Sequence, residues 1–113
     1  MKRLLLAGAA LAAAAGLMPG AAAAQETIKI GVILSLSGQF ADTGVQMENG
    51  IKLYMKQHGD TVAGKKIVLI IKDTGGINPP VAKRLTLELI VRDKADILTG
   101  YSLSPNAFAG ADL

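Results

Sequence analysis

The sequence predicts an α/β fold, doubly wound on a parallel sheet. Three segments rich in Ile, Val and Leu are typical of strands covered on both faces: Thr27–Leu36, Lys65–Lys72 and Ala95–Tyr101. Amphipathic segments with helical spacing follow the first two, which gives the order β-α-β-α-β. Because crossovers between parallel strands are right-handed, we expect the spatial strand order 2-1-3, with the first and third strands adjacent.

The segments between these strands carry helix signals. The first helix is expected over Gly44–His58, ended by Gly59, with one apolar stripe made of Met47, Ile51, Tyr54 and Met55. The second is expected over Val81–Asp93, capped by Asn78 and with prolines in its first turn. Its inner side is expected to carry Val81, Ala82, Leu85, Leu89 and Arg92. A third helix starts at about Pro105.

The first residues carry an export signal. Met1-Lys2-Arg3 is a short basic segment, Leu4–Met18 is fifteen residues without a charge, and Ala22–Ala24 supplies small residues. We therefore expect residues 1–24 to be a signal peptide, cut after Ala24, that exports the chain from the cytoplasm. The alternative is a membrane anchor, but a spanning helix needs about 20 apolar residues.

Composition excludes several classes of partner and cofactor. The net charge is +3, and it falls to +1 without Lys2 and Arg3. Without a basic run, and with only four aromatic residues, the chain is not expected to bind nucleic acid. It has no Cys and a single His, so we expect neither a disulfide nor a metal site, and no cofactor.

Two polar loops are expected to share one crevice. The segments Ser35–Thr43 and Tyr101–Asn106 follow the first and third strands, and strand order 2-1-3 creates a topological switch point between them. Ser104-Pro105 resembles an N-cap with proline in the first turn, where a helix start can bind an anion. The alternative for Ser104 is a helix cap alone.

The first of these loops offers mixed chemistry. Ser37, Gly38 and Gln39 provide hydroxyl, backbone and amide groups. Phe40 either walls the crevice or packs beneath the loop, and Asp73 either contacts a ligand or caps a turn. The loops contain neither a dinucleotide fingerprint, nor a P-loop, nor a nucleophile–base pair, which favours binding over catalysis.

Longer runs of the sequence resemble a known family. The runs IKIGVILSLSGQFADTGVQMENGIKL, KKIVLIIKDTGG and AKRLTLELIVRDKADILTGYSLSPNA are similar to the start of the type I periplasmic solute-binding proteins of ABC importers. The similarity is strongest to the leucine/isoleucine/valine-binding branch and covers residues 26–113. Three features together make the resemblance specific, although any one alone would be weak: the SGxxAxxG pattern at Ser37–Gly44, Asp73 after the second strand, and the G-x-x-x-S loop at Gly100–Ser104.

This resemblance implies a function and a set of ligand contacts. Members have two lobes that close on a small ligand and deliver it to membrane permease subunits. Because members are several-fold longer, residues 25–113 are expected to form a partial first lobe of a truncated chain, with the second lobe missing. The ligand is expected to be a small carboxylate, such as a branched-chain amino acid or an aromatic acid. The alternatives are an extracellular ligand-sensing domain of the same fold or a secreted α/β enzyme fragment.

The resemblance also assigns roles within the two loops. Ser104 matches the position that holds the ligand carboxylate, Leu103 contacts the flank of the ligand, and Ser37–Phe40 meets its side chain. The remaining expected contacts come from the second loop: Tyr101, Pro105 and Asn106.

Overall fold

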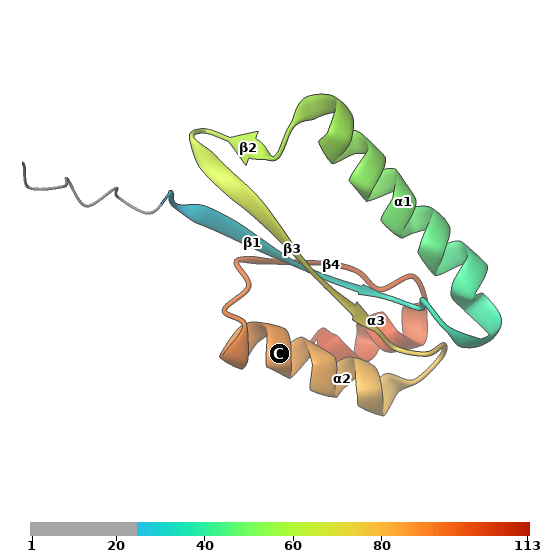
Figure 1. The fold of residues 1–113 in the computed structure, drawn as a ribbon. Helices are drawn as coiled ribbons and strands as arrows, with labels where there is room; N and C mark the ends of the chain where they lie inside the picture. The colour runs from blue at the N-terminus through green and yellow to red at the C-terminus, as the bar shows by residue number, and fades with distance from the viewer. Residues whose placement is uncertain (1–24) are drawn as a thin grey trace, which may run out of the picture.

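The computed structural model describes residues 25–113 as one open α/β sheet with helices on both faces (Figure 1). The expected signal peptide and its cleavage after Ala24 lie outside the described residues. In chain order the elements are β1 (Thr27–Leu34), the 3₁₀ turn η1 (Gly38–Phe40), α1 (Ala41–His58), β2 (Thr61–Val62), β3 (Lys65–Asp73), α2 (Pro79–Leu87), the π-helical turn η2 (Glu88–Arg92), β4 (Ile97–Gly100) and α3 (Ser104–Gly110).

The sheet has the order β2-β3-β1-β4, with β3, β1 and β4 parallel. This confirms the predicted order of the three main strands, in which Ile30 of β1 pairs with Leu69 on one side and Ile97 on the other. The antiparallel strand β2 was not predicted. It is joined to β3 by Ala63 and Gly64, both at positive φ, a turn that usually carries Asn-Gly or Asp-Gly.

One face of the sheet packs against α2 and carries the main core. Ile33 of β1 is buried with Leu85 and Leu89, and Ile70 and Leu98 of the neighbouring strands pack against them. Gly31 allows this close approach, because an ideal Cβ there would lie 2.8 Å from Leu89 Cδ1. The predicted inner side of the second helix is thus confirmed for its apolar members.

The start of α2 follows its sequence signals, but its end does not. Asn78 Oδ1 accepts a hydrogen bond from the Val81 amide at 3.3 Å, and prolines occupy the first turn, as predicted. The helix then widens into a π-helical turn over Glu88–Arg92, which apolar periodicity alone did not indicate. Arg92, predicted to reach outward from the inner stripe, is exposed and pairs with Asp93.

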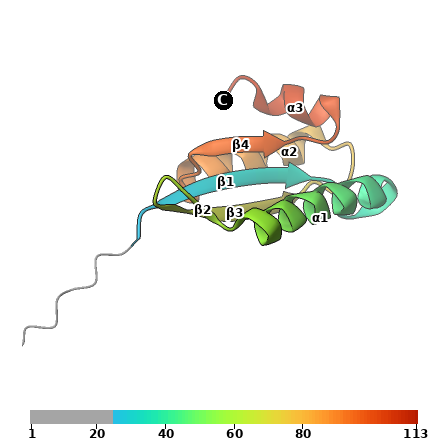
Figure 2. The same cartoon turned by 90° about the horizontal axis from the view of Figure 1, so that it is seen from above.

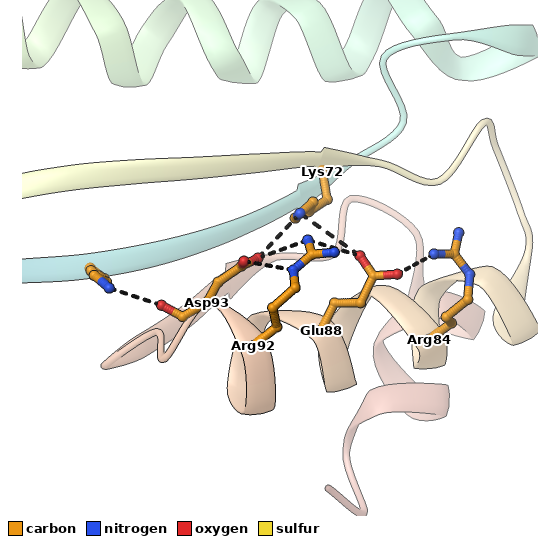
Figure 3. A network of polar contacts seen from close by, with 6 residues as sticks. Lys72, Arg84, Glu88, Arg92 and Asp93 are labelled. Atoms are coloured by element: carbon orange, nitrogen blue, oxygen red, sulfur yellow. Dashed lines mark hydrogen bonds and ion pairs between the residues drawn. The ribbon is translucent and has the colours of Figure 1, made fainter.

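A charged network ties this π-helical turn to the sheet (Figure 3). Lys72 Nζ lies 3.2 Å from Asp93 Oδ2 and 3.8 Å from Glu88 Oε2. The hydrogen bond from Arg92 lowers the pKa of Asp93, with Lys72 adding to this effect and desolvation opposing it. Lys72 therefore connects β3 to the end of the second helical segment.

The opposite face of the sheet is covered by α1 (Figures 1 and 2). The predicted stripe does face the sheet, since all four of its residues line one hollow beneath the helix. However, Met47 is 43% exposed and Tyr54 is 63% exposed, because the helix is the single element on this face of the described sheet. The helix ends at Gly59, at φ 83, where glycine is expected.

Candidate ligand-binding site

The tips of β1 and β4 lie side by side at the carboxyl edge of the sheet. Ile33 pairs with Gly100, and the Tyr101 amide donates a hydrogen bond of 2.6 Å to the Ile33 carbonyl oxygen. On the other side of β1, the Thr74 amide donates to the Leu34 carbonyl oxygen at 2.9 Å. The loops that follow all three parallel strands therefore start from one edge, where open α/β sheets bind their ligands.

Asp73 fixes the first loop to the end of β3. Its Oδ1 accepts hydrogen bonds from the Leu36 amide at 2.7 Å and from the Gly75 amide at 2.8 Å. Its Oδ2 accepts a hydrogen bond of 2.6 Å from Ser37 Oγ. Of the two roles open from the sequence, the turn-capping role is the one observed, and the carboxylate also binds the neighbouring loop.

A buried polar network joins the three loops. Thr74 Oγ1 lies 3.0 Å from Ser35 Oγ, and Asn106 Nδ2 donates to Thr74 Oγ1 at 3.3 Å and to the Gly76 carbonyl oxygen at 2.9 Å. Asn106 Oδ1 accepts a hydrogen bond of 2.9 Å from the Asn78 amide. Among residues 25–113, no buried side-chain nitrogen or oxygen lacks a partner.

Asn106, one of the residues expected to contact the ligand, belongs to this buried network. Asn106 is only 2% exposed and its amide is fully occupied by Thr74, Gly76 and Asn78. The structure therefore places Asn106 beneath the loops, where it holds them together. Neither this role nor that of Thr74 could be predicted from the sequence, because the partners are 28 to 32 residues apart in the chain.

Tyr101 also has a position below the edge. Its backbone is left-handed, with φ 51, directly after Gly100 at φ 96. Its hydroxyl group lies 2.7 Å from Thr86 Oγ1 in α2, and its ring packs against the core formed by Ile33 and its neighbours. The strained backbone turns the chain toward Ser102 and Leu103, while the ring anchors that turn.

The prediction that Ser104 is an N-cap is wrong. Leu103, in extended conformation, is the N-cap of α3, and no side-chain hydrogen bond caps this helix. Ser104 is the first helical residue, followed by Pro105, and both are exposed. Because the Ser104 hydroxyl is not used to cap the helix, it remains accessible at the edge of the sheet.

The first loop turns sharply at Gly38. This residue has φ 75, and an ideal Cβ there would lie 2.7 Å from the Gly75 carbonyl oxygen. Ser37 and Gln39 are exposed, whereas Phe40 is half-buried at the junction between the turn η1 and α1. The structure thus keeps Ser37 and Gln39 of this loop in contact with solvent.

A separate hollow of about 610 Å³ lies between α1 and the sheet. Its lining is almost wholly apolar and includes Met47, Ile51, Tyr54, Ile67 and Leu69. A carboxylate needs hydrogen-bond donors when it leaves water, and this lining has almost none to offer. The polar sheet edge is therefore the better candidate for the predicted ligand.

Two kinds of feature are absent from the described residues, 25–113. No group of three or more His, Cys, Asp or Glu side chains in this range is arranged to hold a metal ion. No helix in the same range has the length and apolar character required to cross a membrane.

Comparison with known proteins agrees with the resemblance in sequence. A family model described as periplasmic binding protein matches residues 27–113. The Leu/Ile/Val-binding protein homolog 6 of Brucella abortus is 33% identical over 92 residues, which cover 81% of this chain and 24% of that protein.

Solved structures of similar fold are solute-binding proteins. One, the solute-binding protein of an ABC transporter from Rhodopseudomonas palustris BisB5 in complex with 3,4-dihydroxybenzoic acid, is 50% identical with a TM-score of 0.74. A second R. palustris solute-binding protein, in complex with 4-hydroxybenzoate, is 37% identical with a TM-score of 0.74. A leucine-binding protein from Thermotoga maritima is 26% identical with a TM-score of 0.71.

These three structures match over 76 to 77% of this chain, but over only 23 to 24% of their own chains. The chain therefore spans about a quarter of the length of its relatives. The family and the structural neighbours are solute-binding proteins rather than enzymes. The matched range, the parallel sheet with helices on both faces and the polar carboxyl edge agree with one another: the chain belongs to the periplasmic binding protein family.

Proposed function

We propose that this chain forms part of the first lobe of a periplasmic solute-binding protein that captures a small aromatic carboxylate for an ABC importer. The observation that carries the proposal is the pairing of β1 with β4, whose loops bring the exposed hydroxyl groups of Ser37 and Ser104 to one edge of the sheet. In an open α/β sheet this edge is the usual ligand-binding place.

The exposed groups of this edge suit an aromatic acid. The Ser104 hydroxyl can donate a hydrogen bond to the ligand carboxylate, and a hydrogen bond to a charged group is worth about 1.5–3 kcal/mol. Leu103 and Phe40, both half-buried, can provide apolar contact for a ring. Gln39 and Pro105, which are exposed, complete the proposed contacts, while Tyr101 and Asn106 support the loops from below.

The expected small carboxylate is either a branched-chain amino acid or an aromatic acid, and the relatives favour the aromatic acid. The neighbour at 50% identity holds 3,4-dihydroxybenzoic acid and another holds 4-hydroxybenzoate, whereas the leucine-binding protein is only 26% identical. Within the edge itself, Asp73 already accepts three hydrogen bonds, so it is poorly placed to pair with the ammonium group of an amino acid.

Delivery and location complete the proposal. Residues 1–24 would act as a signal peptide that is cut after Ala24 and exports the chain to the periplasm. Residues 25–113 would supply one side of a cleft, a second lobe would close over the ligand, and the closed form would dock on the permease subunits of an ABC transporter.

A fusion protein tests this proposal. Residues 25–113 replace the matching first quarter of the BisB5 relative, so that a second lobe is present. Isothermal titration calorimetry then measures the affinity for 3,4-dihydroxybenzoate, 4-hydroxybenzoate, benzoate and leucine. We expect binding of the three benzoates and a weaker interaction with leucine.

A point variant tests the assigned contact. Ser104→Ala should weaken carboxylate binding by about 1.5–3 kcal/mol, which is roughly 10- to 150-fold in Kd. Thr61→Ala is the matched control, because it removes an exposed hydroxyl group bonded to an aspartate, Asp60, in the short strand β2, away from both loops. A fusion that binds leucine but no benzoate would contradict the aromatic assignment, and unchanged affinity in Ser104→Ala would contradict the role of Ser104.

A further inference from the structure

The hydroxyl proton of Ser37 is committed to Asp73. The two side chains meet at 2.6 Å between Ser37 Oγ and Asp73 Oδ2, across the loops that follow β1 and β3. An ionised carboxylate accepts hydrogen bonds but cannot donate them, so the proton in this bond must come from the serine. Ser37 therefore has no hydroxyl proton left to donate elsewhere.

The charge state of Asp73 supports this assignment. Desolvation would raise the pKa of Asp73, but hydrogen bonds from Ser37, Gly75 and Leu36 together hold it below its ordinary value of 3.8. The carboxylate is thus ionised at neutral pH. Its other oxygen is occupied by the Leu36 and Gly75 amides, which fixes the orientation of the carboxylate plane.

The surroundings keep the serine in place and open to solvent. Ser37 is exposed, and the loop turns immediately after it at Gly38, where the Gly75 carbonyl oxygen leaves no room for a side chain. Two loops are therefore locked together around the Ser37–Asp73 bond. The free lone pairs of Ser37 Oγ form a preorganised acceptor at the edge where the ligand is proposed to bind.

We infer that Ser37 is a specificity-determining residue that accepts a hydrogen bond from the ligand, and that it selects aromatic acids bearing a hydroxyl group on the ring. This inference rests on the proposed function, since it concerns the same site. A phenolic hydroxyl can donate to Ser37, whereas a methyl ether of the same phenol offers only an acceptor and leaves the two oxygens facing each other unpaired. The site should therefore bind the phenol more tightly than its methyl ether.

The test compares matched ligand pairs in the fusion protein described above. Calorimetry gives the Kd values of 3- and 4-hydroxybenzoate and of 3- and 4-methoxybenzoate, and the readout is the methoxy-to-hydroxy ratio for each ring position. Unsubstituted benzoate shows whether carboxylate binding itself is intact, and 4-aminobenzoate tests a nitrogen donor. We expect a ratio well above one for at least one ring position.

Variants separate recognition from a purely structural role. Ser37→Ala should lower that ratio by about 3- to 10-fold, the range of one neutral hydrogen bond, with benzoate affinity changed much less. Ser37→Thr keeps the hydroxyl group and should retain the preference. In Asp73→Asn the side-chain amide can donate to Ser37 Oγ, which frees the hydroxyl proton, so the ratio should fall as far as in Ser37→Ala or further. Thr61→Ala should leave the ratio unchanged.

The outcomes distinguish this inference from the proposed function. If the fusion binds benzoates but has the same ratio before and after Ser37→Ala, Ser37 only holds the loop and the inference is overturned. If Ser37→Ala weakens the binding of all ligands equally and leaves the methoxy-to-hydroxy ratio unchanged, the inference is also overturned. If the unmodified fusion binds no aromatic carboxylate, the proposed function itself fails.

Discussion

Gly44 of α1 lies directly against the carbonyl oxygen of Ser35, so close that an ideal Cβ at this position would overlap that oxygen. Gly44 is the one residue of α1 that is fully buried. This contact packs the start of α1 against the end of β1, with only a short loop between the two elements. The loop that carries Ser37 is therefore held from both ends.

Gly44→Ala should disrupt this packing contact between α1 and β1. The added methyl group must displace the backbone of Ser35, and overpacking of this kind costs about 1–3 kcal/mol in the free energy of unfolding. Urea titration of the full chain, followed by circular dichroism, measures the change. Gly50→Ala is the control in the same helix, because nothing lies within 4 Å of an ideal Cβ there. It should stabilise the helix by about 0.5–1 kcal/mol, and equal effects of the two substitutions would contradict the close contact.

Asn106→Ala should destabilise the whole sheet edge. The substitution leaves the Asn78 amide without its hydrogen-bond partner. It also removes one of the partners of the Gly76 carbonyl oxygen and of Thr74 Oγ1, which still bond to each other. An unsatisfied buried polar group costs about 1–3 kcal/mol, so the urea midpoint should fall clearly. Asn49→Ala, on the exposed face of α1, is the control and should change stability little. A midpoint for Asn106→Ala within error of the unmodified chain would show that the loops hold without this amide.

Asp73 should make stability depend on acid pH. Its pKa is lower in the folded chain than its ordinary value of 3.8, so its contribution is present above about pH 4 and is lost as pH falls through the folded value. Asp73→Asn should therefore be less stable than the unmodified chain at pH 7, and the difference should shrink at pH 3. Urea titrations at both pH values measure this. Asp112→Asn, at an exposed position, is the control. If the stability difference between Asp73→Asn and the unmodified chain were equal at both pH values, the predicted pH dependence would be wrong.

The outer edge of β4 should promote self-association. Within the described sheet β4 pairs only with β1, and Ile97 is 49% exposed beside the unpaired edge. Exposed apolar edges invite strand pairing, and a lysine on the edge opposes it. Ile97→Lys should therefore shift the full chain toward the monomer in light scattering at increasing concentration. Lysine at another exposed apolar position, Val91→Lys in the turn η2, should have a smaller effect if the strand edge is responsible.

Much of the fold could be predicted, because its signals are local. Continuous runs of Ile, Val and Leu identified the three parallel strands, and the handedness of crossovers then gave their order. The cap at Asn78 and the glycine after His58 were also local signals, and the structure confirms both. The strand β2 was missed, since its turn uses Ala63 at positive φ in place of the usual Asn.

The site was harder to predict, because its side chains interact across the chain. Proximity of the loops followed from strand order, but the direction of each side chain did not. Asn106 and Tyr101 turned out to support the edge from below through Thr74 and Thr86, residues that no motif singled out. Ser104 was displaced by one position from the expected cap. Sequence signals locate a helix end only to within one or two residues, so they could not resolve this difference.

The most direct test is a crystal structure of the fusion protein with 3,4-dihydroxybenzoate bound. We expect the ligand to lie between the loops after β1 and β4, with its carboxylate within hydrogen-bond distance of Ser104 and a ring hydroxyl within the same distance of Ser37 Oγ. A ligand seated in the apolar hollow beneath α1, or one that touches neither serine, would contradict it.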